Sequence, residues 1–261
     1  MLPHWIWSHF DNGLPLIDYN STVGVHKMKL YMIDSVLQNK LVPSDNYIYG
    51  TAVLSGLIDK KFGNFQFGLS IGKKLDDKIV DSIEFGPTLE YYEHYNQVNK
   101  ELSDKAVEIK NELYKINIDS IVIDPTVSTE FIDNTKTLTV DISHKMVATR
   151  AGLGWIGKAD LFISSRFGPR LRLVSILINK KPYSDSIPIE KSRCGSCNIC
   201  VDLCPAQAAN GKLWNINVRR DDFFNANKCK EMCAELARQE LNIDSRICGI
   251  CVSVCPIGIR G

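Results

Sequence analysis

All nine cysteines of this 261-residue chain lie in its last quarter, and most of them fall into one repeated pattern. The segment CGSCNICVDLCP begins at Cys194, places four thiols within eleven residues and ends on a proline. A shorter version, CGICVSVCP, begins at Cys248, and Cys229 and Cys233 lie between the two runs. Thiols at such spacing act together in metal, redox or disulfide chemistry, so these segments constrain the chain more than any others.

The spacing C-x2-C-x2-C-x3-C-P is that of bacterial ferredoxins, in which three cysteines bind one 4Fe-4S cluster and the fourth binds a second. The approximate twofold symmetry of such segments predicts a first cluster on Cys194, Cys197, Cys200 and Cys255. It predicts a second on Cys204, Cys248 and Cys251. The second cluster needs one more thiolate, from Cys229 or Cys233, and we favour Cys229 because it comes first after the polar segment RRDDFFNANK. The sequence therefore predicts two 4Fe-4S clusters and one spare thiol.

Two other uses of the cysteines fit less well. Zinc sites usually show two separated pairs or mixtures of Cys and His, rather than this repeat. Disulfides are rare in reducing compartments, and the N-terminal segment MLPHWIWSHFDNG lacks the basic and apolar regions of a secretory signal. The longest apolar stretches, such as LRLVSILI, are too short to span a bilayer. We therefore expect a cytoplasmic protein without a membrane helix.

The rest of the chain alternates helix and strand patterns. One long helix is expected within residues 87–117, because Leu102, Ala106, Ile109, Leu113 and Ile116 recur near helical spacing. A shorter helix is expected at about 142–150. Strands are expected at residues 65–71, 120–123, 137–140, 161–164 and 171–178. This alternation predicts an α+β chain whose N-terminal domain is an α/β-type layered domain.

A polar stretch with two prolines, NKKPYSDSIPIEKSR, predicts a domain boundary near residue 186. Residues 1–185 then form the layered domain, and residues 186–261 form a bacterial ferredoxin-like domain. Within the second domain, a helix is expected after RRDDFFNANK, with Asp221 or Asp222 as its N-cap. Cys229 and Cys233 would share one face of that helix, since they are four residues apart.

The segment GLGWIG at residues 152–157 matches the dinucleotide-binding pattern G-x-G-x-x-G. That pattern needs a strand before the glycines and a helix after them. Here a helical stretch precedes the glycines and the strand-like LFIS follows them, so we do not expect a nicotinamide site.

The segment ATRAGLGWIGKADLFISSRFGPRLRLVSILI, followed by the two cysteine runs, resembles the epoxyqueuosine reductase family. The resemblance implies a corrinoid-binding α/β domain joined to a ferredoxin-like domain with two 4Fe-4S clusters, and a relation to the reductive dehalogenases. The clusters would then reduce a bound cobalamin that carries the chemistry. It also implies that the RAGLGWIGK segment lies beside the corrinoid and a cluster, through Arg150, Gly152, Gly154, Trp155, Gly157 and Lys158. The alternative is a tight connection between helix and strand with Trp155 in the core.

Two features depart from the family. Leu138 stands where the resemblance implies a catalytic aspartate, and the nearest acid is Asp141. We take Asp141 as the candidate proton donor, with His144 and Lys145 beside it and a helix N-cap as its structural alternative. The sequence also ends at Gly261, where many family members continue into helical repeats that help to hold transfer RNA.

These observations favour an iron–sulfur oxidoreductase that passes electrons from an external ferredoxin or flavodoxin through both clusters to a cobalamin. The substrate is unidentified. Reduction of epoxyqueuosine in transfer RNA is one alternative, and a non-catalytic electron-transfer or activator protein is another. A net charge of +1 gives no general signal for nucleic acid. Arg166, Arg170 and Arg172 could touch phosphate, although a solvated strand edge is the simpler interpretation, so we do not favour transfer RNA as a partner.

Overall fold

The computed structural model describes residues 32–42, 46–126, 138–182 and 186–258. Its centre is a four-stranded antiparallel sheet in the order β1-β2-β6-β3. The strands are β1 (Tyr47–Val53), β2 (Phe67–Lys74), β3 (Ser120–Ile123) and β6 (Leu171–Ile178). The strand β6 lies between β2 and β3, and its last six residues, from Leu173, are all buried. Helices cover both faces of this strand, which explains why its sequence is almost continuously apolar.

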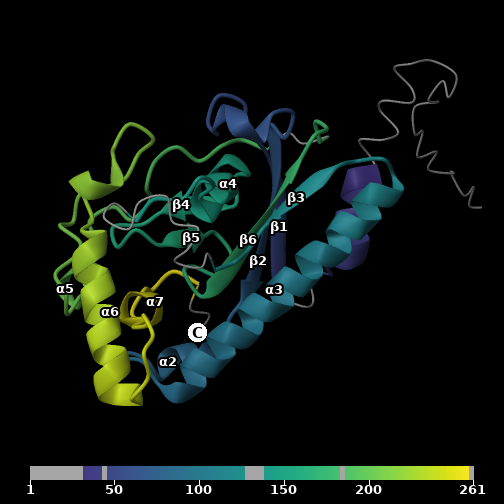
Figure 1. Cartoon of the computed structure of the whole chain (residues 1–261). Coiled ribbons are helices and arrows are strands. Elements are labelled where there is room, and N and C mark those ends of the chain that lie inside the picture. The colour runs from purple at the N-terminus through teal and green to yellow at the C-terminus, as the bar shows by residue number, and fades with distance from the viewer. Residues whose placement is uncertain (1–31, 43–45, 127–137, 183–185, 259–261) are drawn as a thin grey trace, which may run out of the picture.

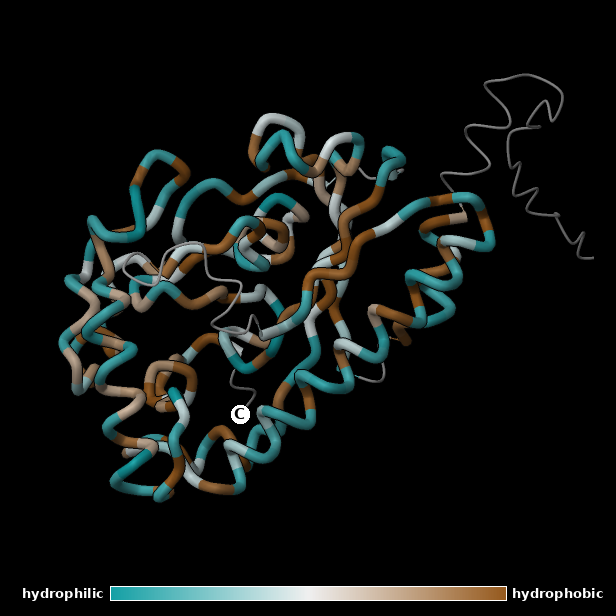
Figure 2. The backbone as a smooth tube through the Cα atoms, in the orientation of Figure 1, coloured by the Kyte–Doolittle hydropathy of each residue, from teal (hydrophilic) through white to brown (hydrophobic). Residues whose placement is uncertain are grey.

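The helix α3 (Leu89–Lys115) covers one face of the sheet (Figure 1). Thr88 caps it by accepting a hydrogen bond from the Tyr91 amide at 3.2 Å. Four of the expected apolar positions are fully buried against the sheet, namely Leu102, Ala106, Ile109 and Leu113. Hydrophilic residues alternate with them along the helix, while hydrophobic residues concentrate on the strands (Figure 2). The predicted long helix is therefore confirmed.

The other face of the sheet is covered by α4 (His144–Arg150), which contacts β1, β2 and β6. Val147 from α4 packs against Ala52, Leu54 and Leu177. The chain then turns through the glycine segment into the hairpin of β4 (Gly154–Ile156) and β5 (Phe162–Ser164). Since a helix precedes these glycines and an antiparallel hairpin follows, a dinucleotide fold does not form here.

The cysteine-rich part contains α5 (Ile199–Asp202), the single turn η4 (Arg220–Asp222), α6 (Ala226–Leu241) and α7 (Ile250–Ser253). These elements lie together beside the β4–β5 hairpin (Figure 1). Near the sheet lie the short elements η2 (Lys60–Phe62) and α2 (Asp77–Asp81), and α2 contacts α7. Residues 32–40 are also helical and bring Ile33 and Leu37 into the core. The α+β architecture with a ferredoxin-like C-terminal part is as predicted. The boundary near residue 186 stays a prediction.

Two local expectations were wrong. Residues 138–140 form no strand, because Leu138 has a φ of 52°, which is incompatible with extended backbone. Residue 137 lies outside the described residues. The N-cap of α6 is Asn225, whose side chain accepts a hydrogen bond from the Lys228 amide at 3.0 Å, and not Asp221 or Asp222. Those two aspartates belong to η4, which ends where Phe223 enters the core.

Arg170 connects the sheet to the cysteine-rich part. Only 2% of its surface is exposed, and its guanidinium pairs with Asp81 at 2.7 Å and with Asp77 at 3.5 Å. It also donates a hydrogen bond to the Ser253 carbonyl of α7 at 3.1 Å. The interpretation of this residue as a solvated strand edge was wrong, because its side chain points into the junction between α2 and α7.

The contact between Gly168 and Ile257 gives a matched pair of glycine substitutions. Gly168 and Gly56 both have a left-handed φ, at 55° and 77°, but a Cβ on Gly168 would lie 1.7 Å from the Ile257 carbonyl oxygen, whereas a Cβ on Gly56 meets nothing within 4 Å. We expect Gly56→Ala to cost about 1 kcal/mol of stability from backbone strain alone. Gly168→Ala should cost about 3 kcal/mol or more, because overpacking adds to the strain. Anaerobic thermal melts compare the two variants, and equal losses would contradict the contact.

Candidate metal centre and the adjoining cavity

The first group of thiols comes from α5, the turn before it and the segment that follows α7. It consists of the four cysteines predicted for the first cluster: Cys194, Cys197, Cys200 and Cys255. They line a cavity of about 70 Å³ together with Gly157 and Lys158. Burial, the largest cause, and the charges of the other three cysteines together raise the pKa of the Cys200 thiol to about 11. All four thiols are therefore close enough to share one cluster.

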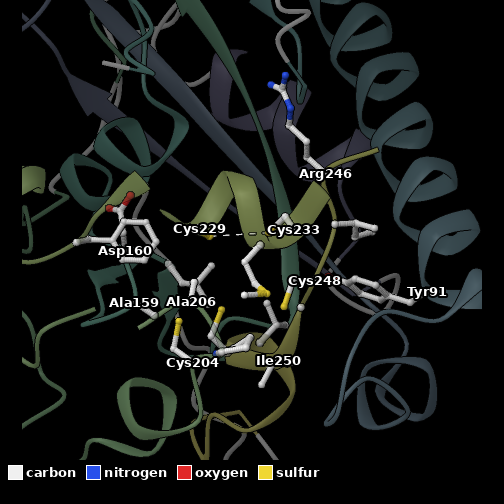
Figure 3. A pocket seen from close by; sticks show the side chains of 18 of the residues that line it. Tyr91, Ala159, Asp160, Cys204, Ala206, Cys229, Cys233, Arg246, Cys248 and Ile250 are labelled. Carbon is white, nitrogen blue, oxygen red and sulfur yellow. Dashed lines mark hydrogen bonds between the residues drawn. The ribbon is translucent and has the colours of Figure 1, made fainter. Parts of the chain in front are cut away.

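The second group surrounds a cavity of about 310 Å³ (Figure 3). It contains the remaining five cysteines: Cys204, Cys229, Cys233, Cys248 and Cys251. The helix α6 presents Cys229 and Cys233 one turn apart, and their Sγ atoms are 3.9 Å from each other. The predicted common face of these two cysteines is confirmed. Within the described residues, no three Cys, His, Asp or Glu side chains converge as closely as a single metal ion requires, and the thiols instead surround cavities.

The pKa of Cys251 reflects the charges of three other cysteines of the second group and one of the first. Burial raises the pKa of Cys251, and the charges of Cys248, Cys229, Cys200 and Cys204 raise it further. The Cys233 thiol hydrogen-bonds with Cys248. This bond, together with the backbone N–H groups of Ile250 and Gly249, outweighs burial and lowers the pKa of the Cys248 thiol to about 7. A thiol whose pKa is close to neutral pH is partly deprotonated there, so Cys248 is ready to bind a metal as a thiolate.

The glycine segment packs against the protein itself. A Cβ on Gly154 would lie 2.1 Å from the Ile163 carbonyl oxygen, and one on Gly152 would lie 2.8 Å from the Ile187 carbonyl oxygen. A Cβ on Gly157 would lie 3.6 Å from the Cys194 sulfur. These glycines therefore permit a close hairpin and a close approach to the first thiol group, and their corrinoid-binding role stays a prediction.

Two other residues of that segment, Trp155 and Lys158, lie near residues that line the first cavity, whereas Arg150 pairs elsewhere. Lys158 is 4% exposed, and its Nζ donates to the Asn198 side chain at 2.7 Å. Trp155 is buried, with the Arg193 guanidinium 5.7 Å from its ring centroid. Arg150, at the end of α4, pairs with Glu190 at 3.0 Å. The structure thus places Gly157 and Lys158 directly on the wall of the first cavity.

A third cavity, of about 250 Å³, lies between the sheet and the second thiol group. Its polar side chains come from three elements and the turn before β5, and they are Tyr91, His144, Lys145, Asp160 and Arg172. Lys145 and Asp160 form an ion pair at 2.6 Å. The Arg172 guanidinium stacks 4.1 Å from the Tyr95 ring centroid and donates to its hydroxyl at 2.9 Å.

The three cavities share parts of their walls. Two residues, Cys251 and Ala159, line both the first and the second cavity. Four residues line both the second and the third, namely Tyr91, Asp160, Arg172 and Val252. Leu161 lines all three. The second thiol group therefore shares more of its wall with the polar cavity than the first group does.

The candidate proton donor Asp141 lies elsewhere. Its carboxylate pairs with Lys61 at 2.7 Å, and it lines none of these three cavities. His144 does line the polar cavity, but burial lowers its pKa to about 4. Its Nδ1 atom is within hydrogen-bond distance of the Ser175 hydroxyl, and its Nε2 atom is within hydrogen-bond distance of the Asp124 carbonyl. The Nε2 atom of His94 accepts a hydrogen bond from the Asp76 amide at 2.9 Å.

Sequence reasoning missed Asp160 and misjudged Arg172. Asp160 belongs to no recognisable sequence motif. It lies in the turn before β5 with a left-handed φ of 55°, and it lines the second and third cavities. Arg172 is half-buried against α3 rather than solvated. Tyr91 and Tyr95 pack in or against the core and also line the second cavity.

Comparison with known proteins identifies the class of the cysteine-rich domain. A family model described as a 4Fe-4S double cluster binding domain matches residues 193–258, which contain both thiol groups. The chain therefore carries a double-cluster 4Fe-4S domain.

The resemblance to epoxyqueuosine reductases is also confirmed. A curated epoxyqueuosine reductase from Lactococcus garvieae is 33% identical over 117 residues, covering 42% of this chain and 30% of the relative. The match thus spans less than a third of that relative's length. Within the described residues, no helix is long and apolar enough to cross a membrane.

Solved structures support the fold. An epoxyqueuosine reductase crystallised with a modified transfer RNA stem loop matches 90% of this chain and 66% of its own, with a TM-score of 0.55 and 19% identity. A reductive dehalogenase whose structure suggested a mechanism for B12-dependent dehalogenation matches 82% of this chain and 30% of its own, with a TM-score of 0.56 and 12% identity. At these identities the likeness concerns the fold.

Proposed function

We propose that the chain is a reductase in which two 4Fe-4S clusters carry electrons, one after the other, to a corrinoid and an unidentified substrate at the polar cavity. The shared walls of the three cavities carry this proposal, because they give electrons a continuous route from the first thiol group to Tyr91, Asp160 and Arg172. The similarity to epoxyqueuosine reductases and to a B12-dependent dehalogenase supports it.

The residues around the polar cavity fit a corrinoid in one respect. Such a group, when bound, supplies a cobalt centre that can take electrons from a cluster and pass them to a substrate. The polar groups of Tyr91, Lys145 and Arg172 would contact its amide-bearing rim. Among the described residues, the Nε2 atoms of His94 and His144 are both engaged in hydrogen bonds, to the Asp76 amide and the Asp124 carbonyl.

Proton supply in this cavity falls to Lys145 rather than to Asp141. The ammonium group of Lys145 is held by the Asp160 carboxylate at 2.6 Å and by the Asp160 carbonyl at 2.8 Å. An ammonium group has three donors, so one N–H remains to face a substrate in the cavity.

Under this proposal Asp141→Ala leaves the turnover rate unchanged, and a large loss of rate would restore Asp141 as the acid.

The test is anaerobic purification with added hydroxocobalamin, followed by metal analysis and electron paramagnetic resonance. We expect about eight irons per chain. We also expect retained cobalt, whose cob(II)alamin signal lacks nitrogen superhyperfine splitting. Eight irons with no retained cobalt would reject the corrinoid and favour an electron-transfer protein that serves a partner enzyme.

Epoxyqueuosine reduction is the second candidate, because relatives that match this chain carry that name. It predicts binding to transfer RNA with a steep dependence on salt. The absence of such binding would exclude it and leave a different substrate for the same electron route.

A further inference from the structure

A groove of about 750 Å³ opens on the surface beside the first thiol group. Two chain segments form it, residues 188–193 and 213–217. They are joined by backbone hydrogen bonds from Ser192 to Trp214 at 2.8 Å and from Ile216 to Glu190 at 3.0 Å. The groove is therefore built on a short antiparallel ladder rather than on two independent loops.

The groove exposes apolar side chains at its floor and rim. Leu213 is 41% exposed and Ile216 is 52% exposed, and Trp214 lies between them. Because the ladder fixes their backbone, these side chains can be covered by a partner with little loss of conformational freedom. Aromatic and apolar residues surrounded by charge are typical of the centre of a protein interface.

The charge at the groove is positive. Lys191 and Arg193 line it, and Lys212 directly precedes Leu213. All three residues are exposed, and no carboxylate within the described residues forms an ion pair with them. The acidic residue of the groove, Glu190, is paired with Arg150 at 3.0 Å. A partner with an acidic surface would therefore meet uncompensated cations here.

Arg193 connects this groove to the first thiol group. It lines both the groove and the first cavity, and it directly precedes Cys194. The first group also shares less of its wall with the polar cavity, only Leu161, than the second group does. Because electron transfer weakens steeply with distance, a donor is most effective where it docks against this group.

We propose that the groove formed by residues 188–193 and 213–217 is the docking site for a small acidic electron-transfer protein that reduces the first cluster. The proposal rests on the proposed function. In each encounter the donor loses one electron, the first cluster gains one, and no bond or proton needs to move. Such transient redox encounters bury little surface and depend on charge for their rate of association.

The test follows reduction of the cluster-loaded chain by flavodoxin hydroquinone in an anaerobic stopped-flow instrument, with dithionite as the second reductant. The variant K191E/K212E removes two cations and adds two acids without touching a residue next to a cluster cysteine. Its matched control is K110E, which reverses an exposed lysine on α3, on the side of the molecule away from α5 (Figure 1). Ile216→Asp tests the apolar centre separately.

We expect K191E/K212E to lower the second-order rate constant with flavodoxin by about 10-fold to 100-fold at low salt, and the difference should shrink as salt screens the charges. Reduction by dithionite and the iron content should not change, and K110E should behave like the parent chain. An unchanged rate with flavodoxin, or an equal slowing with dithionite, would overturn the docking site. Clusters that dithionite cannot reduce in the parent chain would instead reject the proposed function.

Discussion

The Cys229→Ser variant is expected to hold about four irons per chain instead of about eight, whereas Cys233→Ser should keep both clusters. The two cysteines share a face of α6 and their sulfurs are 3.9 Å apart, so each variant is the other's control for helix stability and for the local loss of a thiol.

The reason lies in which thiols surround Cys251. Its pKa is raised by burial first and then by the thiols of Cys248, Cys229, Cys200 and Cys204. Apart from Cys200, which belongs to the first group, these are the predicted partners of Cys251 in the second cluster. Cys233 contacts Cys229 and Cys248 from the side of α6, which fits a spare thiol that hydrogen-bonds to two ligands.

Iron analysis and electron paramagnetic resonance of the dithionite-reduced variants measure this result under anaerobic conditions. A full complement of iron in Cys229→Ser together with a loss in Cys233→Ser would reverse the assignment. A loss of iron in both variants would show that the spare thiol also supports the cluster.

Replacing Arg170 with methionine should lower the melting temperature by roughly 6 to 12 °C. This corresponds to about 3 kcal/mol, the lower end of the cost of breaking a buried ion pair. The lower end applies because Asp77 and Asp81 are about half exposed and regain water when the guanidinium is removed.

The junction between the sheet and the cysteine-rich part should suffer most in this variant, since Arg170 donates to the Ser253 carbonyl of α7. We therefore expect faster loss of iron on warming, measured by the decay of cluster absorbance, in addition to the lower melting temperature. The control is Arg166→Met, at an exposed arginine that stacks on Phe167, which should change stability by less than about 1 kcal/mol. Equal effects in both variants would contradict a structural role specific to Arg170.

Local sequence patterns predicted those helices and strands whose apolar positions match the burial that the fold imposes on them. The strand β6 and the helix α3 were expected because one is continuously apolar and the other has a clear helical stripe. The strand β1 was missed, since the glycine and alanine in YIYGTAV weaken its pattern. The strand expected at residues 137–140 failed at Leu138, whose left-handed backbone no propensity scale indicates.

For the metal centre, the sequence by itself determined that two 4Fe-4S clusters are built from the cysteines of one short segment, because their spacing sets which thiols can converge. Only the tertiary structure decided what adjoins them. Asp160, Lys145 and Arg172 come from positions scattered between residues 145 and 172, and they meet beside the second thiol group because the hairpin, α4 and β6 pack together. Contacts between residues distant in the chain arise from packing of the whole fold, so no local pattern in the sequence could have assigned them to one cavity.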